Sequence, residues 1–85
     1  MHKVILSACG NIDHGENPYS NIVNGEEVSP QIVECATIQE CAQTVLQYID
    51  AHDLGSGNWT GGAVLNAEDK IVGNISYNGR FWPAN

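Results

Sequence analysis

Positively charged residues are scarce in this sequence. Three Lys and Arg residues stand against ten Asp and Glu residues, so the formal net charge is −7 at pH 7. Binding to nucleic acid or to an anionic membrane requires clustered Lys and Arg. The composition therefore argues against both functions. It favours a partner with a basic surface, or a purely solubilising role for the acidic residues.

Long hydrophobic runs are also lacking. The apolar run at residues 4–8 is interrupted by Ser7 and is too short for the hydrophobic region of a signal peptide. No stretch approaches the roughly 20 apolar residues of a membrane-spanning helix. The sequence has three cysteines, an odd number, and their spacing is not that of a disulfide framework, so we expect reduced thiols. We expect a cytoplasmic protein, in the host cell if the chain is phage-encoded.

Catalytic and metal-binding motifs are missing as well. Cys35 and Cys41 do not supply the four ligands of a zinc site. Residues 13–16 lack the regular alternation of a calcium loop. Cys9 with His14 would be a nucleophile pair, but nothing orients the base or builds an oxyanion site. We expect no enzymatic activity, no metal and no cofactor.

The residues that are present predict a single domain over residues 1–85. Residues 3–9 have a strand pattern in which Val4, Leu6 and Ala8 line one face and Ile5 points to the other. Residues 28–36 have a second strand pattern, and Pro30 places that strand at a sheet edge or delays its start. Residues 10–25 are rich in Gly, Asn, Asp and Pro and predict a long loop.

A helix begins after Thr37, where T-I-Q-E forms a capping box, and an apolar stripe follows at spacings of three and four. We expect it to end with Gly55 in a left-handed conformation. Residues 62–66 and 70–77 predict an antiparallel hairpin. The whole is an α+β domain, with an antiparallel four-stranded sheet and one helix on one face, in the order β-β-α-β-β.

The stretch SYNGRFW near the C-terminus contains the strongest short hairpin signal. Asn78-Gly79 suits a two-residue turn, because both residues tolerate positive φ. Such a turn opposes Tyr77 to Arg80 and Ile75 to Trp82, and opposed residues share a face.

Two interpretations of these aromatic residues remain open. Trp82 is expected to lie over Gly73, where the missing side chain leaves room for the indole, and so to cover the core. Alternatively, or in addition, residue types common at interface hot spots form an exposed patch: Trp59, Tyr77, Arg80 and Phe81.

The acidic residues form two groups in the sequence. Asp13, Glu16, Glu26 and Glu27 lie in or beside the long loop, and a second group follows at the helix end and the hairpin turn: Asp50, Asp53, Glu68 and Asp69. If the two groups share a face, they form a negative surface able to meet a basic groove. Scattered solubilising charge is the alternative.

The segments NWTGGAV and KIVGNISYNGRFW resemble the C-terminal hairpin of short proteins from phages and mobile elements. In its size, acidity and lack of motifs the chain also resembles anti-CRISPR proteins, which inhibit RNA-guided nucleases. The resemblance implies a stoichiometric binder that blocks a basic, nucleic-acid-holding surface of a CRISPR-Cas or other defence nuclease component.

Our leading hypothesis is therefore a non-enzymatic acidic inhibitor that binds protein, and neither nucleic acid nor membrane. The residues expected to bind the partner are Asp13, Glu16, Glu26, Glu27, Trp59, Tyr77 and Arg80. The alternative is a small structural or regulatory module that forms a homodimer or larger homo-oligomer through its C-terminal aromatic hairpin.

Overall fold

The computed structural model describes residues 1–11, 15–17, 19–23 and 25–84. The elements follow one another in this order: β1 (His2–Leu6), β2 (Ile22–Val23), β3 (Glu26–Glu27), β4 (Gln31–Cys35), α1 (Ile38–Ala51), a short 3₁₀ helix (Ser56–Asn58), β5 (Ala63–Leu65), β6 (Ile71–Ile75) and β7 (Phe81–Pro83).

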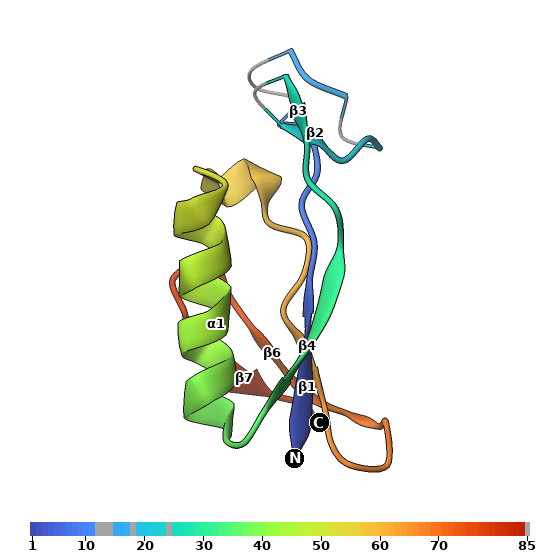
Figure 1. Ribbon diagram of the computed structural model, residues 1–85, viewed down its shortest axis with the longest axis vertical. Helices are drawn as coiled ribbons and strands as arrows, with labels where there is room; N and C mark the ends of the chain where they lie inside the picture. The colour runs from blue at the N-terminus through green and yellow to red at the C-terminus, as the bar shows by residue number, and fades with distance from the viewer. Residues whose placement is uncertain (12–14, 18, 24, 85) are drawn as a thin grey trace.

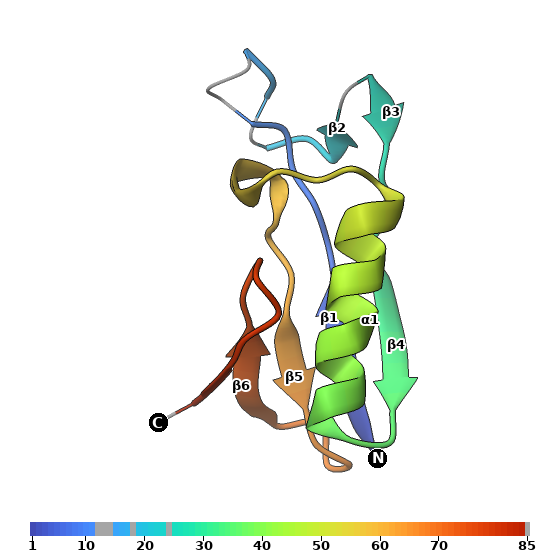
Figure 2. The ribbon, with the colours of Figure 1, turned by 90° about the vertical axis from the view of Figure 1, so that its left-hand side faces the viewer.

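The fold has two layers, a twisted antiparallel sheet and one helix that lies across one face of it (Figures 1 and 2). The strand order is β4-β1-β5-β6-β7, and α1 packs mainly on β1 and β4. The predicted α+β class and the single helix are confirmed. The prediction of four strands is wrong, because the chain after the last turn pairs with β6 as a fifth strand.

The core lies between the helix and the sheet. Strand β1 alternates as the sequence predicts, with Val4 and Leu6 buried on the helix side and Ile5 on the opposite face. Val45 from α1 and Val64 from β5 are fully buried beside them. Each such side chain contributes about 1.5–3 kcal/mol on burial. One face of the sheet is therefore covered, and the other is left open.

The helix termini are set by local hydrogen bonds. At the start, the Glu40 main-chain N–H donates to the Thr37 hydroxyl oxygen at 3.1 Å, as the capping pattern predicts. The predicted end is wrong by two residues, because Asp53 rather than Gly55 adopts positive φ, at 51°. The N–H of Leu54 donates to the Ile49 carbonyl, which is the bond of a Schellman motif.

A small two-stranded sheet lies at the end of the predicted long loop, with β2 inside the predicted range and β3 directly after it. Gly25 supplies the positive φ of its turn, at 82°. Val23 and Val28 are buried and attach this hairpin to the end of the helix layer. Strand β4 begins directly after Pro30 and is an edge strand, and both features follow the prediction.

The C-terminal hairpin has a different register from the predicted one. Ile75 pairs with Phe81 rather than with Trp82, because the loop has three residues and Gly79 adopts φ 81° after a turn closed by its N–H and the Ser76 carbonyl. A slip of one residue exchanges the two faces of a strand. Phe81 therefore packs on the core, and Trp82 is 52% exposed on the open face.

Candidate functional site: an acidic end and a groove beside it

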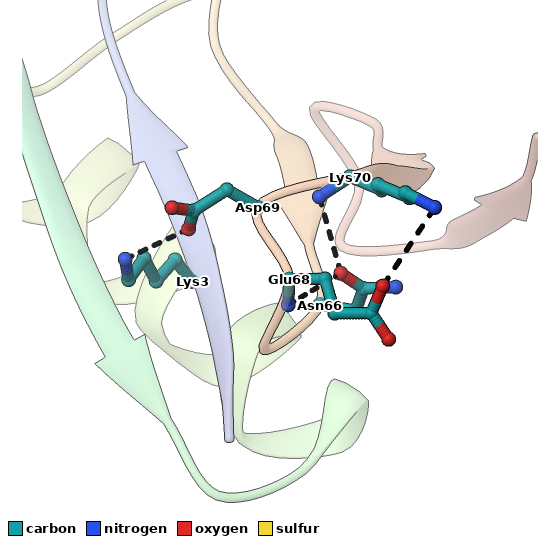
Figure 3. Close-up of polar contacts among 5 residues, drawn as sticks. All are labelled: Lys3, Asn66, Glu68, Asp69 and Lys70. Atoms are coloured by element: carbon teal, nitrogen blue, oxygen red, sulfur yellow. Dashed lines mark hydrogen bonds and ion pairs between the residues drawn. The ribbon is translucent and has the colours of Figure 1, made fainter.

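The charged side chains are distributed unevenly along the long axis of the molecule. At the β5–β6 turn, the Lys3 ammonium lies 2.9 Å from an Asp69 oxygen, and the Lys70 ammonium lies 3.7 Å from a Glu68 oxygen (Figure 3). The Asn66 carboxamide oxygen also accepts from two main-chain N–H groups of this turn. Two of the three basic side chains thus neutralise this end.

Four exposed carboxylates lie at the opposite end, where β2, β3 and the C-terminal end of α1 meet (Figures 1 and 2). They are Glu26, Glu27, Asp50 and Asp53. The last turn of α1, which is described throughout, contains no basic residue to balance the negative end of the helix dipole. We call these four residues the acidic end.

The third basic residue is held elsewhere. The Arg80 guanidinium lies 4.3 Å from the centre of the Trp82 ring, in a cation–π contact on the open face of the sheet. All three Lys and Arg residues fall in the described part of the chain. None of them belongs to the β2–β3 hairpin or to the C-terminal turn of α1.

A cavity of about 230 Å³ lies within the acidic end. Glu26 from β3 and Asp53 after the helix both line it, together with Val23, Val28, Ala51 and His52. A neighbouring cavity of about 310 Å³ lies between α1 and β4, and it shares Ala51 and His52 with the first. We call the pair of cavities the α1–β4 groove.

The α1–β4 groove combines an apolar floor with polar walls. Leu6 and Val33 of the sheet and Thr44, Gln47 and Tyr48 of the helix line the larger cavity. The Tyr48 hydroxyl donates to the Ser29 carbonyl at 3.2 Å, which ties the helix to the segment that leads into β4. Sequence reasoning missed this groove, because its two sides meet only through the tertiary packing.

The predicted partner-binding carboxylates fall into different environments. Glu26 and Glu27 belong to the acidic end. Glu16 is half-buried, and its carboxylate accepts the Asn11 main-chain N–H at 3.0 Å, so it also has a role in the loop. Asp13 lies outside the described residues. Of the second acidic group, Asp50 and Asp53 join Glu26 and Glu27, whereas Glu68 and Asp69 lie at the far end in ion pairs.

The predicted aromatic patch is divided between two faces. Trp59 is half-buried on the helix side, where its indole N–H donates to the Ile75 carbonyl at 3.1 Å and its ring lies 6.0 Å from that of Tyr48. The Tyr77 hydroxyl donates to the Leu54 carbonyl at 3.0 Å. Arg80 stacks on Trp82 over the open face. The structure does not bring Trp59, Tyr77 and Arg80 together.

The open face of the sheet carries large apolar side chains that the sequence reasoning did not place there. Ile32 is 67% exposed and Ile71 is 63% exposed, alongside Trp82. Ile71 points outward because a β-bulge shifts the pairing so that it opposes Leu65, and Leu65 in turn opposes Lys3. Simple alternation from the buried Gly73 would have placed Ile71 inside.

Two of the three cysteines are core thiols, and Cys9 is half-buried outside the core. Cys35 and Cys41 are buried, and all three cysteines are free. Burial, and then a hydrogen bond with Cys35, raises the pKa of the Cys41 thiol to about 12, so it stays protonated near neutral pH. Over the described residues, no three His, Cys, Asp or Glu side chains gather as a metal-ligand group.

Comparison with known proteins adds no relative. No family model matches the chain, and neither the curated proteins nor the solved structures gave a match. Within the part of the chain that the structure describes, no helix combines the length and the apolar character needed to cross a membrane.

Proposed function

We propose that the protein is a non-enzymatic binding module whose acidic end docks on a basic surface of a partner protein. The partner class is a nucleic-acid-handling component of a host defence system, as for the anti-CRISPR proteins that the sequence resembles. The module acts by occupying the surface that would otherwise hold nucleic acid.

The observation that carries this proposal is the separation of charge along the molecule. Glu68 and Asp69 have Lys partners, whereas Glu26, Glu27, Asp50 and Asp53 gather where no Lys or Arg is placed. Negative side chains at the C-terminus of a helix, here Asp50 and Asp53, face the negative end of the helix dipole and typically lower stability by about 0.3–1 kcal/mol each. A concentrated negative potential that faces solvent attracts a basic partner and accelerates encounter.

The experiment is capture of partners from the lysate of a host cell, with the purified protein immobilised through its C-terminus. We expect the captured proteins to include a basic, nucleic-acid-handling protein, and its recovery to fall steeply between 50 mM and 500 mM salt because exposed charges are screened. Recovery of no basic protein at low salt would contradict the proposal.

A second function is favoured by a different observation, the open apolar face with Ile32, Ile71 and Trp82. An exposed apolar sheet face is typical of an association surface. In that case the protein forms a homo-oligomer that is insensitive to salt and is lost in Trp82→Ala. Sedimentation velocity at 50 mM and 500 mM salt distinguishes this function from the first, in which the free protein is a monomer.

A further inference from the structure

The free edge of β4 is the starting point. Strand β4 has a single neighbour, β1, and their pairing sets Val4 opposite Val33 and Ile5 opposite Ile32. The Ile5 carbonyl accepts from the Gly62 N–H on the β5 side. In an antiparallel strand the N–H and C=O of one residue point to the same side, so both groups of Ile5 face β5. Ile5 and Ile32 are therefore opposite each other without main-chain hydrogen bonds between them. The N–H and C=O of Ile32, and those of Glu34, therefore face away from β1.

This edge differs from the opposite edge of the same sheet. Strand β7 has three residues and ends in Pro83, which has no N–H to offer. Strand β4 has five residues without Pro or Lys, and Glu34 is its one charged residue. Natural proteins protect sheet edges with Pro, Lys or short strands. The β7 edge has such protection, and the β4 edge lacks it.

The α1–β4 groove lies where an added strand would send its side chains. Alternate side chains of a strand placed beside β4 would point toward the helix layer. There they would meet the groove walls supplied by Thr44, Gln47 and Ala51 and its floor at Val33. Figure 2 shows β4 at the margin of the sheet with α1 running alongside it.

The groove also has a charged end. It continues past Ala51 and His52 into the cavity that Glu26 and Asp53 line. That cavity adjoins the negative C-terminal end of the helix. A Lys or Arg side chain is the group that complements it. A second copy of this chain is a poor occupant, because each copy has a net charge of −7.

We propose that an extended segment of a basic partner protein adds to the free edge of β4, with alternate apolar side chains in the α1–β4 groove and a Lys or Arg side chain between Glu26 and Asp53. The mode is β-strand addition, in which main-chain hydrogen bonds supply affinity and the pockets supply specificity. This inference rests on the proposed function and names the part of the partner that is recognised.

The test uses a displayed library of random linear twelve-residue peptides, selected on the intact protein. Two variants of Ile32 are compared after circular dichroism has shown that both are folded. Ile32→Pro removes the main-chain N–H that residue 32 offers at the free edge. Ile32→Thr keeps this N–H and loses a similar amount of apolar side-chain surface, so it is the matched control. Gln47→Trp fills the groove from the exposed side of the helix and gives an answer even if Ile32→Pro does not fold.

We expect the selected peptides to alternate apolar residues, to lack Pro in that stretch and to carry Lys or Arg at one end. They should bind Ile32→Thr within about threefold of the wild type, and bind Ile32→Pro and Gln47→Trp at least about tenfold more weakly. Peptides that bind all variants equally, peptides without a basic residue, or no selected peptide would each overturn the inference. Salt-sensitive capture of a basic protein from lysate would then still support the proposed function.

Discussion

Glu26 and Asp53 line the same cavity, although one belongs to a hairpin at the end of the predicted loop and the other follows the helix. Their approach depends on Val23 and Val28, which are buried and attach the hairpin to the end of the helix layer. The acidic end is thus held in place by packing in the core rather than by an independent loop. Carboxylates on a fixed scaffold need little ordering when a partner binds, which reduces the entropic cost of association.

The conformation of Asp53 gives the first prediction. Asp53 has φ 51°, a region that favours glycine, and it lies at the negative end of α1. We expect Asp53→Gly to raise the free energy of unfolding by about 0.5–1 kcal/mol, measured by urea denaturation. Asp50→Asn is the control, since it removes a neighbouring charge without a change in φ. A loss of stability in Asp53→Gly would contradict the Schellman arrangement.

The register of the C-terminal hairpin gives the second prediction. A Cβ added to Gly73 would collide with the Phe81 ring, so this ring covers the glycine. We expect Phe81→Ala to lower the free energy of unfolding by about 2–3 kcal/mol, because the ring is half-buried. Trp82→Ala should lower it by less than about 1 kcal/mol, since the indole contributes mainly its contact with Arg80. The reverse order would indicate the two-residue turn that the sequence predicts.

Those local features that depend on neighbouring residues could be predicted from the sequence. The N-cap at Thr37, the helical stripe and the alternation in β1 all appear in the structure, because each is decided by contacts within a few residues or by one period of hydrophobicity. The late start of β4 after Pro30 belongs to the same class.

Features that depend on register or on distant contacts could not be predicted. An Asn-Gly pair fits both a two-residue turn and a three-residue loop with Gly in the left-handed region, and the choice exchanges Phe81 with Trp82. The bulge that exposes Ile71 leaves no local signal. Which carboxylates gain a Lys partner depends on a contact between Lys3 and Asp69, from opposite ends of the sequence.

The buried thiol of Cys41 gives a prediction about pH. Its pKa is raised from about 9 to about 12 by burial and by its hydrogen bond with Cys35. A raised pKa means that the stability it contributes is complete below pH 9 and is lost as the pH rises toward 12. We expect the free energy of unfolding to fall between about pH 9 and pH 10.5, and to fall less in Cys41→Ala.

The pH measurement needs a comparison of slopes, because Cys41→Ala also leaves a small cavity that lowers stability at every pH. The pKa values of Lys3 and Tyr48 are raised as well, the first by its bond and charge interaction with Asp69 and the second by burial. Their contributions are common to both proteins and cancel in the comparison. Equal slopes in the wild type and Cys41→Ala would show that the thiol is not shielded from water.

The most direct measurement of the central claim compares two double variants that remove the same charge from opposite ends. Glu27→Gln with Asp50→Asn changes the acidic end, and Glu68→Gln with Asp69→Asn changes the ion-paired turn. Both raise the net charge from −7 to about −5. We predict that binding to the partner captured from lysate weakens at least about tenfold in the first variant at 50 mM salt, and by less than about threefold in the second. Equal weakening in the two variants would show that net charge alone governs binding and would contradict a docking surface at the acidic end.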